Sequence, residues 1–359
     1  MEPGRRRQQS SRSALAGRAL IEQRQFEPPG WLRSAHLQTI LGSLPPQRWL
    51  IVRRAQRLRA LAQQWLIDCG EGVRLQGFLS RAAAAPGAAA RLAVLLHGWE
   101  GSSDSSYVLS LGAQLLEHNF DVLRLNLRDH GQTHHLNRDL FHSCRLPEVL
   151  GACVAAAQRF PAARLYLAGF SLGGNFLLRV AAEARAPAAI AGVVAISPVL
   201  EPEATLRALE QGWPIYRRYF MRHWTRSLRL KQRAWPGVYE FERLLQRADL
   251  RALTAELVRQ CTAFPTLAQY LSGYALTGAR LATLRAPASV LLADDDPMIP
   301  AQDLQQLAAC AQLTLVRTRY GGHCGFVEHW ARASFADRFV CERFEQFERQ
   351  AQSATALAI

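Results

Sequence analysis

Short apolar runs that alternate with segments of helical periodicity are the feature that most constrains this fold. Leu92–Leu96 is entirely apolar, as expected for a strand buried on both faces, and helical spacing follows at Tyr107–His118. Further strands are predicted at 122–127, 164–168, 191–196, 289–293 and 313–318, and further helices at 149–159, 172–184 and 301–309. This alternation implies right-handed crossovers, so the sequence predicts an α/β fold with a mostly parallel central sheet flanked by helices.

Three regions lie outside this alternation. Residues 1–25 are rich in Arg, Gln, Ser and Ala, and we expect a disordered basic arm. An alternating strand is expected at 73–79 on a partly exposed sheet edge. Residues 200–280 are rich in aromatic, Arg and Leu residues without a clear strand, which predicts a helical cap insertion. The core is then divided into a first part, 26–199, and a second part, 281–359.

The net charge of +14 raises the question of a polyanionic partner. Of the 43 basic residues only Lys231 is a lysine, and the arginines are scattered apart from a cluster at 217–233. Such scatter argues against nucleic acid and leaves peripheral association with an anionic membrane surface as an option. The sequence shows neither a signal-type apolar stretch nor an 18-residue apolar run, so we expect a cytoplasmic protein. Its seven cysteines lack the paired spacing of disulfide frameworks, and we expect reduced thiols.

A G-x-S-x-G pattern at Gly169–Gly173 places Ser171 between a predicted strand and a predicted helix. Small residues around the serine allow a tight, strained turn that lifts the hydroxyl above the sheet. This context predicts that Ser171 is a nucleophile, because the pattern is specific only between a strand and a helix.

A serine hydroxyl needs a base, and the base needs an orienting acid. His323 follows the last predicted strand in a glycine-rich loop, which favours it as the base. Asp296 stands four residues before Pro300, a spacing common in hydrolases with this pattern, and is predicted to be the acid. Asp295 stays open as the alternative; the remaining carboxylates are expected to cap the helix that follows.

The loop after the strand at 92–96 is predicted to contribute to an oxyanion hole. In folds of this type one amide donor comes from this loop and the other from the residue after the nucleophile. We therefore expect the backbone N–H groups of Trp99 and Leu172 to bind the oxyanion, with His97 supporting the loop.

Histidines at 130, 134, 135 and 142 form a second cluster that invites a metal interpretation. No carboxylate or cysteine lies at an obvious ligand spacing from them. We expect a loop at the entrance of the pocket, with no metal and no cofactor.

Five motifs in order resemble the YheT-like branch of the α/β-hydrolases. They are the 26–44 segment with His36–Ile40, the His97–Ser103 loop, Gly169–Gly174, Asp295–Pro297 and Gly322-His323. The resemblance implies an α/β-hydrolase fold and an esterase or lipase-like activity on carboxylic esters. The chain departs from the branch at 126–137 and in the cap, which concerns the substrate rather than the triad.

Three functions remain open from the sequence. The first is hydrolysis of a small-molecule or lipid ester with an apolar acyl chain, through an acyl-enzyme. The second is acyl transfer to an alcohol by the same triad. The third is a non-catalytic binding protein on a hydrolase scaffold.

Overall fold

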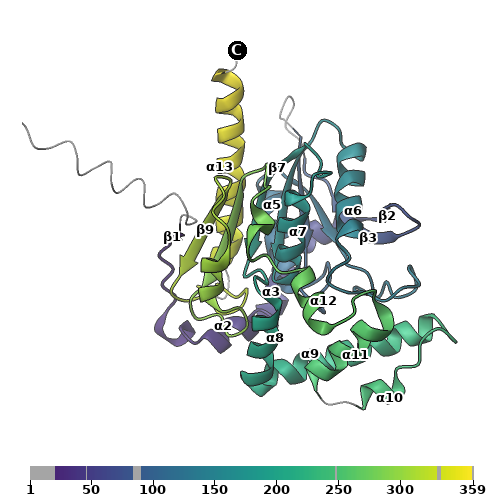
Figure 1. The fold of residues 1–359 in the computed structure, drawn as a ribbon. Helices are drawn as coiled ribbons and strands as arrows, with labels where there is room; N and C mark the ends of the chain where they lie inside the picture. The colour runs from purple at the N-terminus through teal and green to yellow at the C-terminus, as the bar shows by residue number, and fades with distance from the viewer. Residues whose placement is uncertain (1–20, 46, 84–89, 247–248, 330–332, 358–359) are drawn as a thin grey trace, which may run out of the picture.

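The computed structural model describes residues 21–359 except 46, 84–89, 247–248, 330–332 and 358–359. Its centre is a nine-stranded sheet in the order β1-β9-β8-β7-β6-β4-β5-β3-β2 (Figure 1). The strands are β1 (Ile21–Gln23), β2 (Gln63–Asp68), β3 (Arg74–Ser80), β4 (Arg91–Leu96), β5 (Asp121–Leu125), β6 (Arg164–Phe170), β7 (Ile190–Ile196), β8 (Ala288–Ala293) and β9 (Leu313–Thr318). All neighbouring pairs are parallel except β3 with β5 and β3 with β2. The predicted α/β fold with a mostly parallel sheet is confirmed.

Helices cover both faces of the sheet. On one face lie α5 (Ser106–Glu117) and α13 (Phe335–Leu357), and on the other α6 (Leu146–Arg159) and α7 (Leu172–Ala182). Successive side chains of a strand point to opposite faces, so Leu95 joins the α5–α13 core and Leu96 joins the α6–α7 core. Burial on both faces explains why these strands are continuous apolar runs.

The N-terminal region differs from the expected disordered arm. Residues 1–20 lie outside the described residues, but Ile21–Gln23 forms the edge strand β1 and pairs in parallel with β9. Ion pairs from Glu22 to Arg343 and from Arg24 to Glu342 attach this strand to α13. For residues 21–23 the expected disorder is wrong, because a three-residue strand on a sheet edge has no periodicity of its own.

The opposite edge of the sheet also corrects a prediction. The strand expected at 73–79 is β3, but it does not form the edge, because β2 pairs with it in antiparallel register from Gln63↔Leu79 to Asp68↔Arg74. Between β1 and β2 the chain forms η1 (Gly30–Leu32), α2 (Ala35–Leu41), α3 (Gln47–Arg54) and α4 (Gln56–Ala60).

Between β7 and β8 the chain forms a group of helices, which we call the cap. Its members are α8 (Pro202–Gln211), α9 (Pro214–Ala234), α10 (Glu242–Leu245), α11 (Leu250–Cys261) and α12 (Leu267–Gly273), followed by η2 (Ala279–Leu281). They gather at one end of the sheet, in the lower part of Figure 1. The helix expected at 301–309 is shorter, a 3₁₀ helix η3 (Ala301–Gln306).

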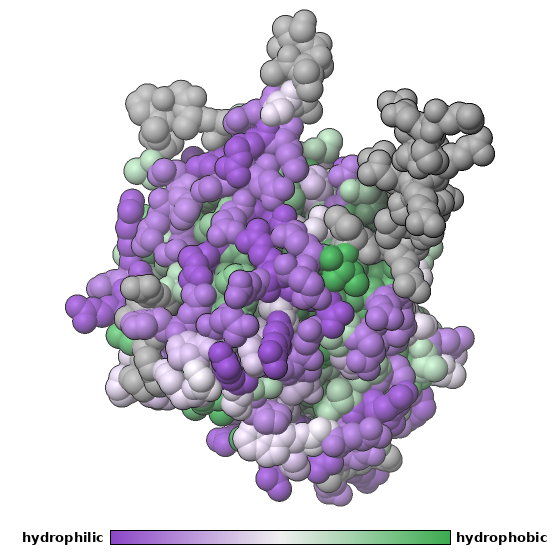
Figure 2. Space-filling view, turned by 90° about the vertical axis from the view of Figure 1, so that its left-hand side faces the viewer, coloured by the Kyte–Doolittle hydropathy of each residue, from purple (hydrophilic) through white to green (hydrophobic). Residues whose placement is uncertain are grey.

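The outer surface is mostly hydrophilic on the side of the molecule where β1 lies. Figure 2 views the molecule from the side on which β1 lies in Figure 1, and hydrophilic residues cover most of that face, with hydrophobic ones in small separate spots. Among the described helices, none combines the length and the apolar character needed to cross a bilayer.

Candidate active site

Ser171 occupies a strained turn between β6 and α7. Its backbone has φ 51° and ψ −120°, outside the regions that a serine normally adopts. Two glycines make the turn possible. A Cβ on Gly169 would lie 2.5 Å from the carbonyl carbon of Gly173, and a Cβ on Gly173 would lie 2.4 Å from the carbonyl oxygens of Leu96 and His97. The G-x-S-x-G spacing therefore reflects backbone contact between α7 and the ends of β6 and β4.

Asp296 lies after β8 and contacts His323. Its Oδ2 lies 2.9 Å and its Oδ1 3.2 Å from His323 Nδ1, and its side chain is fully buried. The Oδ1 atom also accepts hydrogen bonds from the backbone N–H groups of Met298 and Ile299, at 2.9 and 3.0 Å. These bonds fix the carboxylate in the orientation that holds the imidazole.

Asp294 and Asp295, which precede Asp296 along the chain, contact other groups. Asp295 Oδ1 accepts a hydrogen bond from the backbone N–H of Gly322 at 2.9 Å, whereas Asp294 pairs with Arg317 at 2.6 Å. The expectation that they cap the following helix is wrong, because their side chains turn toward β9 and the loop after it. Through its bond to Gly322, Asp295 stabilises the loop that carries His323.

His323 sits in a loop that the N-terminal segment holds in place. Its backbone N–H donates to Thr39 Oγ1 at 2.9 Å. Gln38 is fully buried and bonds both the N–H and the carbonyl of Val327, at 2.7 and 2.9 Å. A Cβ on Gly322 would lie 2.4 Å from the carbonyl oxygen of Ala35. The His36–Ile40 motif therefore has a positioning role that the sequence did not reveal.

The electrostatics of His323 follow from this enclosure. Burial by itself lowers the pKa of the imidazole, but the Asp296 carboxylate, and after it Cys324, outweigh burial and raise the pKa well above its usual value. The structure brings Ser171 and His323 to the same cavities. No hydrogen bond joins the Ser171 hydroxyl to the imidazole in this structure, a bond that often forms only with bound substrate.

The loop after β4 lies directly beside the serine. A Cβ on Gly98 would be 3.2 Å from the Cβ of Ser171. His97 is fully buried; its Nδ1 donates to the Gly98 carbonyl at 2.7 Å and its Nε2 accepts from the Leu127 N–H at 3.2 Å. Burial lowers the pKa of His97 to about 3, so the ring stays neutral and holds the loop.

Leu172 is the first residue of α7, where backbone N–H groups lack partners within the helix. The assignment of the Trp99 and Leu172 amides to an oxyanion hole stays a prediction.

The expected histidine cluster is divided. His130 Nδ1 donates to the Arg128 carbonyl and its Nε2 accepts from the Glu100 N–H, so it supports the loop after β4. His134 bonds Ser227 of α9, and only His142 of the four lines a cavity beside Ser171. Within the described part of the chain, no group of three or more His, Cys, Asp or Glu side chains is arranged to hold a metal ion.

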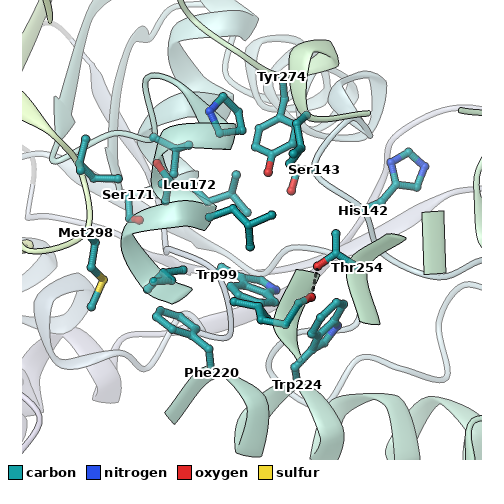
Figure 3. A pocket seen from close by; sticks show the side chains of 18 of the residues that line it. Trp99, His142, Ser143, Ser171, Leu172, Phe220, Trp224, Thr254, Tyr274 and Met298 are labelled. Carbon is teal, nitrogen blue, oxygen red and sulfur yellow. Dashed lines mark hydrogen bonds between the residues drawn. The ribbon is translucent and has the colours of Figure 1, made fainter. Parts of the chain in front are cut away.

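Two cavities meet at Ser171. The first, of about 120 Å³, is shown in Figure 3 and is walled by apolar and aromatic side chains. Trp99 stacks on Phe220 of α9 with a ring-centre distance of 5.0 Å and meets the edge of Trp224 at 5.2 Å. The second, of about 410 Å³, extends from Ser171 and His323 toward α2, α3 and α5.

Buried polar contacts attach the cap to the core. Lys231 of α9 is fully buried and donates to Asp129 Oδ1 at 2.8 Å and to the carbonyls of Asn137 and Asp139 at 2.6 and 3.0 Å. Asn175 of α7 donates to the carbonyls of Val199 and Tyr274, which border the cap, both at 2.8 Å. Sequence reasoning missed both anchors, although the single lysine of an Arg-rich chain was a signal for the first.

The fold and this site define the class of the protein. The family model for the alpha/beta hydrolase fold matches residues 93–329, more than half of the chain. The chain therefore belongs to the α/β-hydrolase family, and a hydrolase function follows at that level.

Individual proteins are also similar to this chain. The chain is 25% identical over 252 residues to the YheT protein of Escherichia coli, covering 65% of this chain and 70% of that one. It is 23% identical over 284 residues to the medium-chain fatty acid ethyl ester synthase/esterase 2 of Saccharomyces cerevisiae, covering 72% of this chain and 62% of that one. These matches confirm the resemblance to the YheT-like branch at low identity. An esterase from Pyrococcus furiosus shares the fold with a TM-score of 0.52 and 15% identity, over 80% of this chain and 92% of that one.

Proposed function

We propose that this protein is a serine esterase that hydrolyses carboxylic esters with an apolar acyl chain. The observation that carries the proposal is the buried contact of Asp296 with His323, whose imidazole lines the same cavities as the strained Ser171. Ser171 Oγ attacks the ester carbonyl while His323 Nε2 takes its proton. The C–O bond to the alcohol then breaks, and the alcohol leaves with that proton. Water then attacks the acyl-enzyme while His323 Nε2 takes its proton. The bond between the acyl group and Ser171 Oγ breaks, Oγ takes the proton back from His323, and the carboxylic acid leaves.

Each remaining residue has a stated role. Asp296 holds the Nδ1–H tautomer and stabilises the imidazolium. The amides of Trp99 and Leu172 bind the oxyanion, and the positive end of the α7 dipole favours the same negative charge.

The first cavity is the natural place for the acyl chain. Leu206 and Leu209 of α8, together with Leu250 of α11 and Leu271 of α12, line it and belong to the buried core around the cap. Apolar walls bind apolar chains by removing their surface from water. This supports preference for a hydrocarbon acyl group.

Acyl transfer to an alcohol uses the same residues and is the second candidate. It is favoured by one observation, since the second cavity offers space beside His323 for an acceptor other than water. The yeast relative carries both synthase and esterase in its name. Product analysis with ethanol competing against water distinguishes the two reactions.

The test is a screen of p-nitrophenyl esters of graded chain length together with labelling by a fluorophosphonate. We expect a covalent adduct on Ser171, and a loss in kcat/KM of about 10³-fold or more in a folded Ser171→Ala variant. A wild-type protein that is folded but neither labelled nor active would favour the non-catalytic binding protein. A Ser171→Ala variant as active as wild type would remove this serine from the mechanism.

A further inference from the structure

The second cavity has both apolar and polar walls. Trp99, Phe170 and Phe220 line it together with Ser171, and a separate group of polar side chains from α3, α5 and the start of α13, which we call the polar end, also lines it. This polar end consists of Gln47, Arg54, Ser106, Ser110, Ser334 and Asp337.

Gln47, the first residue of α3, is the unusual member of this polar end. The residue is 4% exposed, and its side-chain Oε1 atom has no hydrogen-bond partner among the described residues. Buried polar atoms in folded proteins nearly always have a partner, so an exception that lines a cavity indicates a missing ligand or water. This oxygen can only accept a hydrogen bond, so whatever meets it must donate one.

Structural roles account for part of the polar end. Asp337 Oδ2 accepts from the backbone N–H of Ser334 at 3.0 Å, and Ser334 Oγ accepts from the N–H of Asp337 at 3.1 Å, which closes the first turn of α13. Ser110 Oγ also donates to Asp337 Oδ2 at 2.6 Å. Gln47, Arg54 and Ser106 have no such role within the described residues and remain for a ligand.

Charge at this end selects against an ionic ligand. Burial raises the pKa of Asp337, and the Arg54 guanidinium acts in the opposite direction. A phosphate near Arg54 would also meet the Asp337 carboxylate, and an ammonium would meet Arg54. A neutral hydroxyl avoids both repulsions, donates to Gln47 and accepts from Arg54 or Ser106.

The histidine loop indicates which part of the substrate enters here. The leaving alcohol takes its proton from His323, so it must depart beside this loop. Cys324 and Gly325 line the second cavity and are absent from the lining of the first. The alcohol therefore occupies the second cavity while the acyl chain occupies the first.

We propose that the polar end of the second cavity binds a free hydroxyl on the alcohol part of the ester, so that the substrates are esters of diols or polyols rather than of simple alkanols. This rests on the proposed esterase function. Gln47 is then a specificity residue that contacts the alcohol part of the substrate.

The test compares monoesters of straight-chain α,ω-diols, of increasing length, with n-alkyl esters of equal heavy-atom number and the same acyl group. We expect the diol ester of the matching length to exceed its alkyl partner about fivefold in kcat/KM, the value of one net hydrogen bond. Gln47→Leu should remove that preference and leave the alkyl ester within about twofold. The matched control is Gln64→Leu on the exposed edge strand β2, which should keep the preference.

The outcomes separate the two proposals. Equal rates for diol and alkyl esters at every length would overturn the subsite, as would a Gln47→Leu variant that slows both esters equally. If Gln47→Leu does not fold, Ser106→Ala should lower the preference by about twofold without changing the alkyl ester, and an unchanged preference counts against the subsite. Failure of wild type to cleave either ester would instead refute the esterase function.

Discussion

The catalytic loops and the cap are held in different ways. Ser171 and Asp296 are positioned by backbone geometry: a positive φ and glycine contacts at Ser171, and main-chain N–H groups bonded to the Asp296 carboxylate. The loop of His323 adds side-chain contacts from Thr39 and Gln38. The cap is held by side chains, above all by Lys231. We therefore expect substitutions in the cap to reshape the first cavity without moving Ser171, so the proposed chemistry and its substrate specificity should be separable.

The largest expected effect lies on the catalytic side. Asp296→Asn should lower kcat by about 10⁴-fold, because the amide favours the wrong imidazole tautomer. Asp295→Asn should keep activity within about tenfold, since an asparagine Oδ1 can still accept from Gly322. Kinetics of both variants on one p-nitrophenyl ester make the measurement, with circular dichroism to confirm folding. Equal losses of kcat in the two variants would contradict the assignment of Asp296 as the acid of the triad.

The next effect concerns the anchor of the cap. Lys231→Met leaves the buried Asp129 carboxylate without its ammonium, and we expect a loss of about 3–5 kcal/mol in the free energy of unfolding. Urea denaturation measures it, with Arg233→Met, exposed on the same helix, as the control. The Lys231→Met, Asp129→Asn double variant should recover part of the loss. Under folded conditions Ser171 should still react with a fluorophosphonate; loss of labelling would show that the cap and the nucleophile are not independent.

The pH dependence should separate activity from stability. Only neutral imidazole can act as the base, and the pKa of His323 is raised, so kcat/KM should rise about tenfold per pH unit until that raised pKa is passed. The stabilisation from the charged His323–Asp296 pair runs the other way: it is fully present below the ordinary histidine pKa and is lost as pH rises through the raised one. Rate profiles and thermal melts from pH 5 to 10 make the measurement. A kcat/KM that is already constant from pH 6 would contradict the raised pKa.

The smallest effect tests the proposed acyl site in the first cavity. Thr254 of α11 lines it and donates only to the Leu250 carbonyl within its own helix (Figure 3). Thr254→Leu adds volume to the cavity, so the longest accepted acyl chain should shorten and its kcat/KM fall several-fold, while acetate and butyrate esters change by less than about twofold. Thr262→Leu, which removes the same kind of helix bond outside the cavity together with the bond that Thr262 Oγ1 accepts from the Phe264 N–H, should leave the chain-length profile unchanged. A uniform loss over all chain lengths would argue that the acyl group lies elsewhere.

Much of the core was predictable because its signals are local. Strands buried on both faces are continuous apolar runs, and the elbow at 169–173 needs small residues at fixed spacing around Ser171. The pairing of Asp296 with His323 was predicted from the spacing of Asp296 to Pro300 and from the glycine-rich loop that carries His323 after the last strand, and the structure places these two side chains in contact.

The rest depends on contacts between distant segments that leave no periodic trace. The edge strand β1 is defined only by its pairing with β9, and the role of Thr39 only by the loop that it holds. The two cavities likewise arise from the packing of the cap and the N-terminal helices on the core. The carboxylates near Asp296 were misassigned because capping was the nearer local explanation.

Lys231 has a practical consequence beyond its ion pair. It carries the only ε-amine in the chain, and folding removes that amine from solvent. Reagents that acylate lysine should therefore leave this position unmodified in the native protein. They should react with it once α9 separates from the loop that contains Asp129, Asn137 and Asp139. The rate of modification at this single position, followed by peptide mass spectrometry, would report how often the cap opens.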